Sequence, residues 1–266
     1  KNLFIASTHD FVLFFTNRGR VHRKKGYMIP EAGRTARGTN IVNILPLEQG
    51  EQVTAMMLLR EFREDEYLMM VTRNGTVKRL RLTEINTARK AGIRALSLEE
   101  GDELISVSRT NGNDNILLTT ADGMAICFNE NDVRIMGRDA AGVRGIALDA
   151  DDYVVGAGIA AEGKQLLTVT ENGFGKKTAL SEYRMQSRGG LGLTNYKVDE
   201  EHGAVCGIKV VDESDDLMFI SSDGVIIRVA CSEIRAMGRV AKGVRVMRVN
   251  EGQKVVAFTR TEAAQD

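Results

Sequence analysis

Long apolar runs are absent from the 266-residue sequence, and none approaches the roughly 18 residues that a membrane-spanning helix needs. Residues 1–6 enter a strand pattern at once and do not resemble a signal peptide, so we expect a cytoplasmic protein. Cysteine is scarce as well. The three cysteines, Cys127, Cys206 and Cys231, are an odd number without Cys-x-x-Cys spacing, which favours reduced packing residues over disulfides or metal ligands.

Catalytic motifs are also absent. The three histidines, His9, His22 and His202, do not recur at a fixed place and lack the spacing of metal ligands. The sequence has no Gly-x-Ser-x-Gly elbow and no phosphate loop that ends in Gly-Lys-Ser/Thr. The glycine cluster at 189–192 lacks the strand–turn–helix context of a nucleotide site. We therefore predict no catalytic residue, no metal and no cofactor in this chain.

The sequence has no net charge, because 36 Lys and Arg balance 36 Asp and Glu. Domains that bind nucleic acids are usually basic, so the total charge alone argues against such a function, and the distribution of the charges has to decide. Proline occurs only twice, at the edges of strand patterns, and no window shows a long amphipathic helical pattern. These features predict an all-β chain.

What the sequence does contain is a repeat. Five strand–turn–strand patterns each break at a glycine, and these glycines lie 56, 48, 50 and 51 residues apart. A second glycine follows each of them by 17 or 19 residues. A period near 50 residues predicts one supersecondary unit stacked on copies of itself. The turn glycines are Gly19, Gly75, Gly123, Gly173 and Gly224, and the second glycines are Gly38, Gly92, Gly142, Gly192 and Gly243.

The third repeat shows the expected unit. Residues 116–120 and 124–128 form a hairpin around Asp122-Gly123, because glycine reaches positive φ without steric cost. Residues 143–148 and 153–157 follow as a third and a fourth strand, and four strands are the content of one propeller blade. We expect the third strands of other repeats at 41–45, 93–98 and 244–249. The prediction is one propeller-like domain over 1–266, with repeats roughly at 1–60, 66–109, 114–160, 164–211 and 216–260.

Charged residues recur at fixed positions of the repeat as well. The loop between the second and third strands is basic in every repeat, whereas the turn before the fourth strand is acidic in the first four. In a ring, equivalent positions lie at equivalent places on each blade, so a neutral protein can carry a continuous basic belt. We expect the glycines beside the belt to expose backbone N–H groups to a phosphate. The basic loops contain Arg34 and Arg37; Arg89, Lys90 and Arg94; Arg134, Arg138 and Arg144; Arg184 and Arg188; and Arg235, Arg239, Lys242 and Arg245.

Three segments resemble a known family. Residues 26–38, Gly-Tyr-Met-Ile-Pro-Glu-Ala-Gly-Arg-Thr-Ala-Arg-Gly, and the following 41–48 closely resemble the C-terminal domain of bacterial DNA gyrase A. Segments 134–146 and 171–178 look like later blades of that domain. The resemblance covers essentially the whole chain, and the first motif favours gyrase over its paralogue, topoisomerase IV.

The resemblance implies a β-pinwheel, a ring of blades that exchange strands and wrap duplex DNA on a basic outer rim. It also implies that the cleavage tyrosine lies in the N-terminal part of gyrase A, and the ATPase in gyrase B, so that ATP and Mg act elsewhere. The implied partners are double-stranded DNA and the gyrase holoenzyme, which comprises the rest of gyrase A together with gyrase B. We expect this chain itself to be a monomer without enzymatic activity, in the cytoplasm with the nucleoid.

One motif of the family departs from its usual place. The first blade of the family carries a gyrase box, Gln-Arg-Arg-Gly-Gly-x-Gly, and no intact copy is present here. Residues 186–192, Gln-Ser-Arg-Gly-Gly-Leu-Gly, are a partial echo in the fourth repeat. We expect the intact domain to have six blades, with a domain of five as the alternative. The sequence leaves undecided whether the ring is closed.

Sequence-independent binding and bending of duplex DNA is the leading hypothesis. A ring that docks an acidic protein is an alternative, because neutral charge and propeller architecture suit it as well. A propeller enzyme with a central site is a third reading, which the missing catalytic motifs disfavour. The residues predicted to contact DNA are Arg34, Arg37, Arg89, Lys90, Arg94, Arg138, Arg144, Lys176, Lys177, Arg184, Arg188, Arg239, Lys242 and Arg245.

Overall fold

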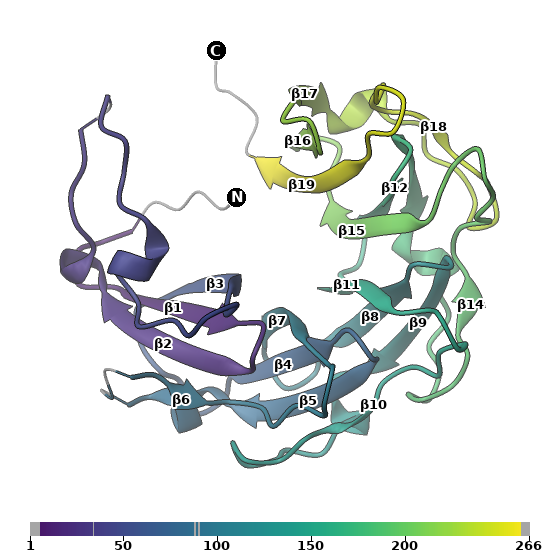
Figure 1. The fold of residues 1–266 in the computed structure, drawn as a ribbon. Coiled ribbons are helices and arrows are strands. Elements are labelled where there is room, and N and C mark those ends of the chain that lie inside the picture. Colours follow the sequence, from purple (N-terminus) through teal and green to yellow (C-terminus); the bar gives the residue numbers. More distant parts are fainter. Residues whose placement is uncertain (1–5, 34, 88, 90, 262–266) are drawn as a thin grey trace.

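The computed structural model describes residues 6–33, 35–87, 89 and 91–261. Five antiparallel sheets, one for each repeat, follow one another around an open arc (Figure 1). The first and fifth sheets lie at the two ends of the arc. The predicted ring of blades is therefore present, and it is open.

Each sheet runs from the inside of the arc to its outer edge. Blade 1 has the order β3 (Val53–Leu59), β1 (Phe11–Thr16), β2 (Arg20–Lys25) and β6 (Ile93–Arg94). Blade 2 has the order β7 (Leu104–Thr110), β4 (Tyr67–Thr72), β5 (Thr76–Arg81) and β10 (Val143–Arg144). Blade 3 has the order β11 (Val154–Ile159), β8 (Asn115–Thr120), β9 (Met124–Asn129) and β14 (Leu193–Thr194).

Blade 4 has the order β15 (Val205–Val211), β12 (Gln165–Thr170), β13 (Phe174–Ala179) and β18 (Val244–Arg245). In blade 5 the described residues form three strands, in the order β19 (Val255–Thr261), β16 (Asp216–Ser221) and β17 (Ile226–Ala230). Short 3₁₀ helices lie in the connections: η1 (Gly26–Met28), η2 (Ile41–Asn43), η3 (Leu82–Ile85), η4 (Glu130–Asp132), η5 (Leu180–Glu182) and η6 (Cys231–Glu233).

The outermost strand of blades 1 to 4 comes from the following repeat. β10, for example, belongs to the third repeat but pairs with β5 of blade 2 through Val143↔Val77 and Arg144↔Thr76. The strand exchange that the family resemblance implied is thus confirmed. The third repeat supplies the four strands predicted for it, of which one joins the preceding blade, and the exchanged strands contain two residues instead of the five or six predicted.

The turn glycines explain why the exchanged strands are so short. After β14, the backbone N–H groups of Asn195 and Tyr196 both donate to the carbonyl of Gly123, at 2.7 and 3.0 Å. The chain therefore leaves the sheet to cross the hairpin turn. A β-carbon on Gly123, whose φ is +83°, would lie 2.1 Å from the Tyr196 carbonyl oxygen. Glycine is required here both for positive φ and for this close approach.

The first repeat behaves differently, because the described residues place no blade before it. Segment 41–45, predicted to be a strand, instead contains the 3₁₀ helix η2, where the Asn40 side chain accepts a hydrogen bond from the backbone N–H of Val42. Leu45 is almost fully buried and packs with Val12 and Phe14 on the outward face of blade 1. Without an outer strand to pair with, this loop folds back and covers the end of the arc.

The core consists of four apolar layers, each between two consecutive blades. β4 shows why the inner strands read as continuous apolar runs. Its residues Leu68 and Met70 face the layer shared with blade 1, and Met69 and Val71 face the layer shared with blade 3. A strand that is buried on both faces has no polar side, so the usual alternation is lost.

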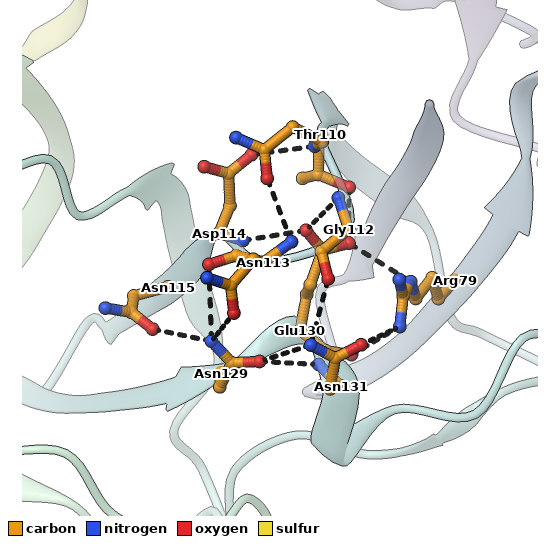
Figure 2. A network of polar contacts seen from close by, with 10 residues as sticks. Arg79, Thr110, Gly112, Asn113, Asp114, Asn115, Asn129, Glu130 and Asn131 are labelled. Atoms are coloured by element: carbon orange, nitrogen blue, oxygen red, sulfur yellow. Dashed lines mark hydrogen bonds and ion pairs between the residues drawn. The ribbon is translucent and has the colours of Figure 1, made fainter. Parts of the chain in front are cut away.

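A buried polar network adds to the contact between blades 2 and 3 (Figure 2). The Glu130 carboxylate accepts hydrogen bonds from the Thr110 hydroxyl at 2.7 Å and from the backbone N–H groups of Gly112 and Asp114 at 2.8 Å. Its Oε2 lies 3.1 Å from Nε of Arg79, whose guanidinium stacks on the Tyr67 ring. Both oxygens of this buried carboxylate are thereby satisfied by donors of the protein.

Because a neighbouring repeat crosses only some of the hairpin turns, replacing the turn glycine by alanine should cost more unfolding free energy in some blades than in others. Gly123→Ala should lower the melting temperature more than Gly224→Ala, since a β-carbon at Gly224, with φ +86°, meets nothing within 4 Å. Positive φ should lower the unfolding free energy of both variants by about 1–2 kcal/mol, and overpacking should lower that of Gly123→Ala by about 1–3 kcal/mol more. Thermal unfolding followed by circular dichroism measures the difference, and equal shifts would contradict the double role of Gly123.

Removal of the buried carboxylate should destabilise the domain strongly. Glu130→Ala leaves the Arg79 guanidinium without its anionic partner and should cost about 3–5 kcal/mol of unfolding free energy. Glu48→Ala is the control, because Glu48 is exposed and pairs with Arg18 and Arg20 at the surface, where such pairs contribute about 0–1 kcal/mol. Urea denaturation of both variants tests this, and a cost below about 1 kcal/mol for Glu130→Ala would refute it.

Candidate nucleic-acid interface

The exchanged strands and the loops that lead into them form the outer edge of the arc, where Figure 1 shows β6, β10, β14 and β18. We call this surface the outer rim and define it as residues 86, 87, 89, 91–94, 133–144, 183–194 and 234–245. The loops of repeats 3, 4 and 5 lie along β5, β9 and β13 of the preceding blades. The parallel bridges Arg79↔Ile135, Cys127↔Met185 and Lys177↔Ala236 fix the loops of repeats 3, 4 and 5 in this way.

Arginine recurs at three positions of these loops. The first position lies just after the 3₁₀ helix and is exposed in three repeats, as Arg134, Arg184 and Arg235. The second lies four residues before the second glycine and is half-buried, as Arg138, Arg188 and Arg239. The third lies on the exchanged strand and is exposed, as Arg94, Arg144 and Arg245.

The second-position arginines are partly held by the blade beneath them. Arg188 donates from Nε to the Asp132 carbonyl at 2.8 Å and from Nη1 to the Arg144 carbonyl at 3.0 Å. Arg239 donates from Nη1 to the Thr194 carbonyl at 2.8 Å. A guanidinium has five N–H donors, so each of these side chains keeps donors for a ligand at the rim.

Three further predicted contacts are exposed, and two others lie outside the described residues. Arg89 and Lys242 are exposed on the rim, whereas Arg37 is exposed on the loop of the first repeat, which lies on no preceding blade. Arg245 stacks its guanidinium on the Phe174 ring at 4.5 Å. Arg34 and Lys90 lie outside the described residues.

The predictions for Lys176 and Lys177 are wrong. Both side chains are almost fully buried. The Lys176 ammonium donates to the backbone carbonyls of Asn195, Gly238 and Arg239, and Lys177 pairs with Glu213 at 2.6 Å. Neither ammonium is presented to a ligand at the rim. They lie on consecutive residues of β13, so their side chains point to opposite faces of the blade, and both faces are covered.

Lys78, which the sequence analysis did not single out, is the counterpart of Lys176. Each lies three residues after a turn glycine, and this shared phase is the signal that could have identified the pair. The Lys78 ammonium donates to the carbonyls of Ala95, Arg138 and Ala140 at 2.7, 2.6 and 2.9 Å. Desolvation by burial lowers the pKa of both lysines to about 8.

The second glycines serve the exchange of strands, because the backbone of the preceding blade approaches them closely. A β-carbon on Gly142 would lie 2.6 Å from the Val77 carbonyl oxygen, and one on Gly192 would lie 2.4 Å from that of Ala125. Gly243 meets the Gly175 carbonyl at 2.5 Å in the same way. Gly38, on the loop without a preceding blade, meets nothing within 4 Å.

The acidic turns also have a structural role. The Asp102 carboxylate accepts hydrogen bonds from the backbone N–H groups of Asn74 and Glu103, and that of Asp152 accepts from Asp122 and Tyr153. These carboxylates thus brace the hairpin turn of their own blade, as expected for a repeated turn. At the equivalent place in blade 4, the neighbouring Lys242 ammonium and the backbone N–H of His202 lower the pKa of Asp199.

Within the described ranges, no three His, Cys, Asp or Glu side chains gather as metal ligands would. The helices of that part of the chain are all too short to cross a membrane. Cys127 and Cys231 are buried packing residues, and burial raises the pKa of the Cys127 thiol to about 11. The chemistry that the site offers is therefore that of a row of arginines.

Comparison with known proteins agrees with the resemblance to gyrase. The family model "DNA gyrase C-terminal domain, beta-propeller" matches five segments: residues 10–60, 66–111, 114–161, 164–212 and 215–262. DNA gyrase A of Salmonella typhimurium is 46% identical over 97% of this chain, and that of Escherichia coli is 45% identical over the same share. The chain spans 29% and 30% of these relatives, less than a third of their length.

Two solved structures share the fold. The C-terminal domain of DNA topoisomerase IV superimposes with a TM-score of 0.89 at 27% identity, over 96% of this chain and 80% of the other. The DNA gyrase A C-terminal domain gives a TM-score of 0.82 at 26% identity, over 96% and 83%. Five matched repeats, strand-exchanged blades and relatives at 45–46% identity together show that this chain belongs to the family of DNA gyrase C-terminal β-propeller domains.

Proposed function

We propose that this chain binds duplex DNA along its outer rim and bends it, without reading its sequence. The observation that carries the proposal is the recurrence of arginine at three positions of the rim loops, each filled in three of the four loops, on the outer edge of an arc. Arginine binds phosphate through two parallel N–H donors and remains charged at any physiological pH. A row of such groups follows a phosphate backbone that runs along the rim.

The shape of the rim supports bending. Backbone contacts position a duplex without specifying bases, and they recur only if the duplex follows the curve on which the arginines lie. The cost of smooth bending, of order 1–6 kcal/mol for a 20–30 bp segment, has to be offset by these additional contacts. Counterion release supplies the driving force, so a chain with no net charge can bind DNA through one basic edge.

The relatives suggest the larger setting. Because they are DNA gyrase A proteins and the chain matches less than a third of each, we propose that it serves a type II topoisomerase as a DNA-wrapping module. Under this proposal, DNA cleavage and ATP hydrolysis belong to other parts of the enzyme. The module itself needs no cofactor and acts as a monomer beside the rest of gyrase A and beside gyrase B in the bacterial cytoplasm.

Charge reversal on the rim should weaken DNA binding at every sequence alike. The double variant Arg138→Glu/Arg239→Glu replaces two attractive phosphate contacts by repulsion, and we expect at least a hundredfold loss of affinity at about 0.1 M salt. Fluorescence anisotropy with two unrelated duplexes measures it. Arg63→Glu is the control for a single charge reversal, because Arg63 is an exposed arginine in the connection between β3 and β4 and is not one of the rim residues.

The control decides between a specific surface and general charge. An equal loss for Arg63→Glu would contradict rim binding. An unaltered affinity of the rim variant for DNA, with binding instead to an acidic protein, would favour the docking hypothesis.

Salt should weaken the complex steeply. If about eight phosphates are neutralised, the logarithm of the binding constant falls against the logarithm of salt concentration with a slope of about −7. Each rim arginine replaced by alanine should make the slope shallower by about one unit. Titrations at four or more salt concentrations give the slope, and an affinity insensitive to salt would exclude phosphate contacts as its source.

A further inference from the structure

Two buried lysines occupy one equivalent position of the repeat, three residues after the turn glycine. Blades 2 and 4 carry Lys78 and Lys176 there, whereas blades 1, 3 and 5 carry His22, Ile126 and Ile227. Both lysine side chains are fully buried. A buried ammonium costs desolvation energy that an aliphatic side chain of similar size avoids, so its presence calls for an explanation beyond packing.

The hydrogen bonds of both lysines join two successive repeats. Lys78 of blade 2 donates to Ala95, which follows the strand of its own repeat exchanged onto blade 1, and to Arg138 and Ala140 in the rim loop of the third repeat. Lys176 repeats the pattern with Asn195, Gly238 and Arg239. An ammonium has three N–H donors and no acceptor, so three converging carbonyls satisfy it completely.

In both blades, one of the three carbonyls belongs to the second-position arginine of the rim, Arg138 or Arg239. The lysine thus fixes the backbone from which that guanidinium projects. Charged groups near Lys78 are Asp139, Glu84 and Arg138, and those near Lys176 are Glu182 and Arg239, none of them within ion-pair distance of the ammonium in the described residues. Backbone carbonyls, and not a carboxylate, hold each ammonium.

We propose that Lys78 and Lys176 are positioning residues for DNA binding, which hold Arg138 and Arg239 on the outer rim from beneath. This inference rests on the proposed function of the rim. In blade 3, Ile126 takes the place of the lysine, and Arg188 is held by two bonds of its own guanidinium, to the carbonyls of Asp132 and Arg144. Arg239 has one such bond, to the Thr194 carbonyl, in addition to the lysine beneath it.

Alkaline pH should loosen both arginines together. Because burial lowers the pKa of both lysines to about 8, they lose a proton in the folded protein well before exposed lysines do. A neutral lysine amine has two N–H donors and a lone pair. One of the three carbonyls around each lysine therefore loses its donor and faces the lone pair. Arginine does not titrate in this range. DNA affinity at constant ionic strength should therefore fall as pH rises from 7 to about 9.5.

The test uses Lys78→Met and Lys176→Met in the full 266-residue chain, with a linear duplex of about 150 bp as the probe. We expect each variant to bind about three- to tenfold more weakly, with a salt slope shallower by up to about one unit. Lys177→Met is the matched control. It removes an equally buried cation from the adjacent residue of the same strand, but one paired with Glu213 instead of the rim loop.

Two comparisons separate positioning from a loss of fold. Melting temperatures identify any variant that does not fold. The pH dependence of DNA binding by the unsubstituted chain is then compared with that of Arg138→Ala/Arg239→Ala, which leaves both lysines in place. If the lysines act through these arginines, the fall in affinity between pH 7 and 9.5 disappears in the arginine variant.

The outcomes are distinct. Affinities of Lys78→Met and Lys176→Met equal to that of Lys177→Met, or a pH dependence unchanged in the arginine variant, would overturn the positioning role while leaving rim binding intact. Absence of DNA binding by the unsubstituted chain would overturn the proposed function itself.

Discussion

The structure depends on one constraint: among the described residues, no repeat pairs the outer edge of its own sheet. In blades 1 to 4, the outer edge is paired by a short strand that the next repeat contributes. This exchange leaves few unpaired strand edges, which are otherwise sites of aggregation, and it joins consecutive blades by main-chain hydrogen bonds as well as by apolar layers. It also carries the basic loop of each repeat onto the outermost position of the preceding blade. The same device that holds the arc together therefore builds the rim.

At the two ends of the arc, the exchange of strands with a neighbouring repeat is missing on one side in the part of the chain that the structure describes. In the described residues, β17 receives no exchanged strand, and Val225 and Ile226 are about half exposed. The turn glycine of that blade, Gly224, has open space around it, and so has Gly38 in the loop of the first repeat. At every internal junction the corresponding glycines touch a neighbouring repeat. The glycines thus mark where one repeat crosses another.

Much of this architecture can be predicted from the sequence, because glycine spacing and apolar runs depend on local conformation and on burial. The number of blades, the hairpins and the basic loops follow from residues such as Gly123 and Arg138. Strand lengths do not follow, since the end of β14 is decided by hydrogen bonds between Tyr196 and a turn of the preceding repeat. The strand predicted at 41–45 fails for the same reason: a strand needs a partner, and the partner's position is a tertiary property.

Charge is harder to predict than fold. The sequence gives the charge of a lysine but not the direction or burial of its side chain. Lys176 and Lys177 therefore cannot be told apart from the rim arginines by their charge. Only the three-dimensional structure shows that Lys78 and Lys176 point inward and bind the carbonyls of the loops above them. The basic belt thus has two layers, with arginines exposed to solvent on the outside and, in two blades, a buried cation beneath.

The most direct test of the account is the shape of bound DNA. A linear duplex of about 25 bp, labelled at both ends, is mixed with the chain, and its end-to-end distance is followed by energy transfer. If the rim binds a duplex along its outer curve, saturation with protein brings the ends closer together, and added salt separates them as the complex dissociates. Tight binding that leaves the ends as far apart as in free DNA would contradict the claim that the curved row of arginines bends the duplex.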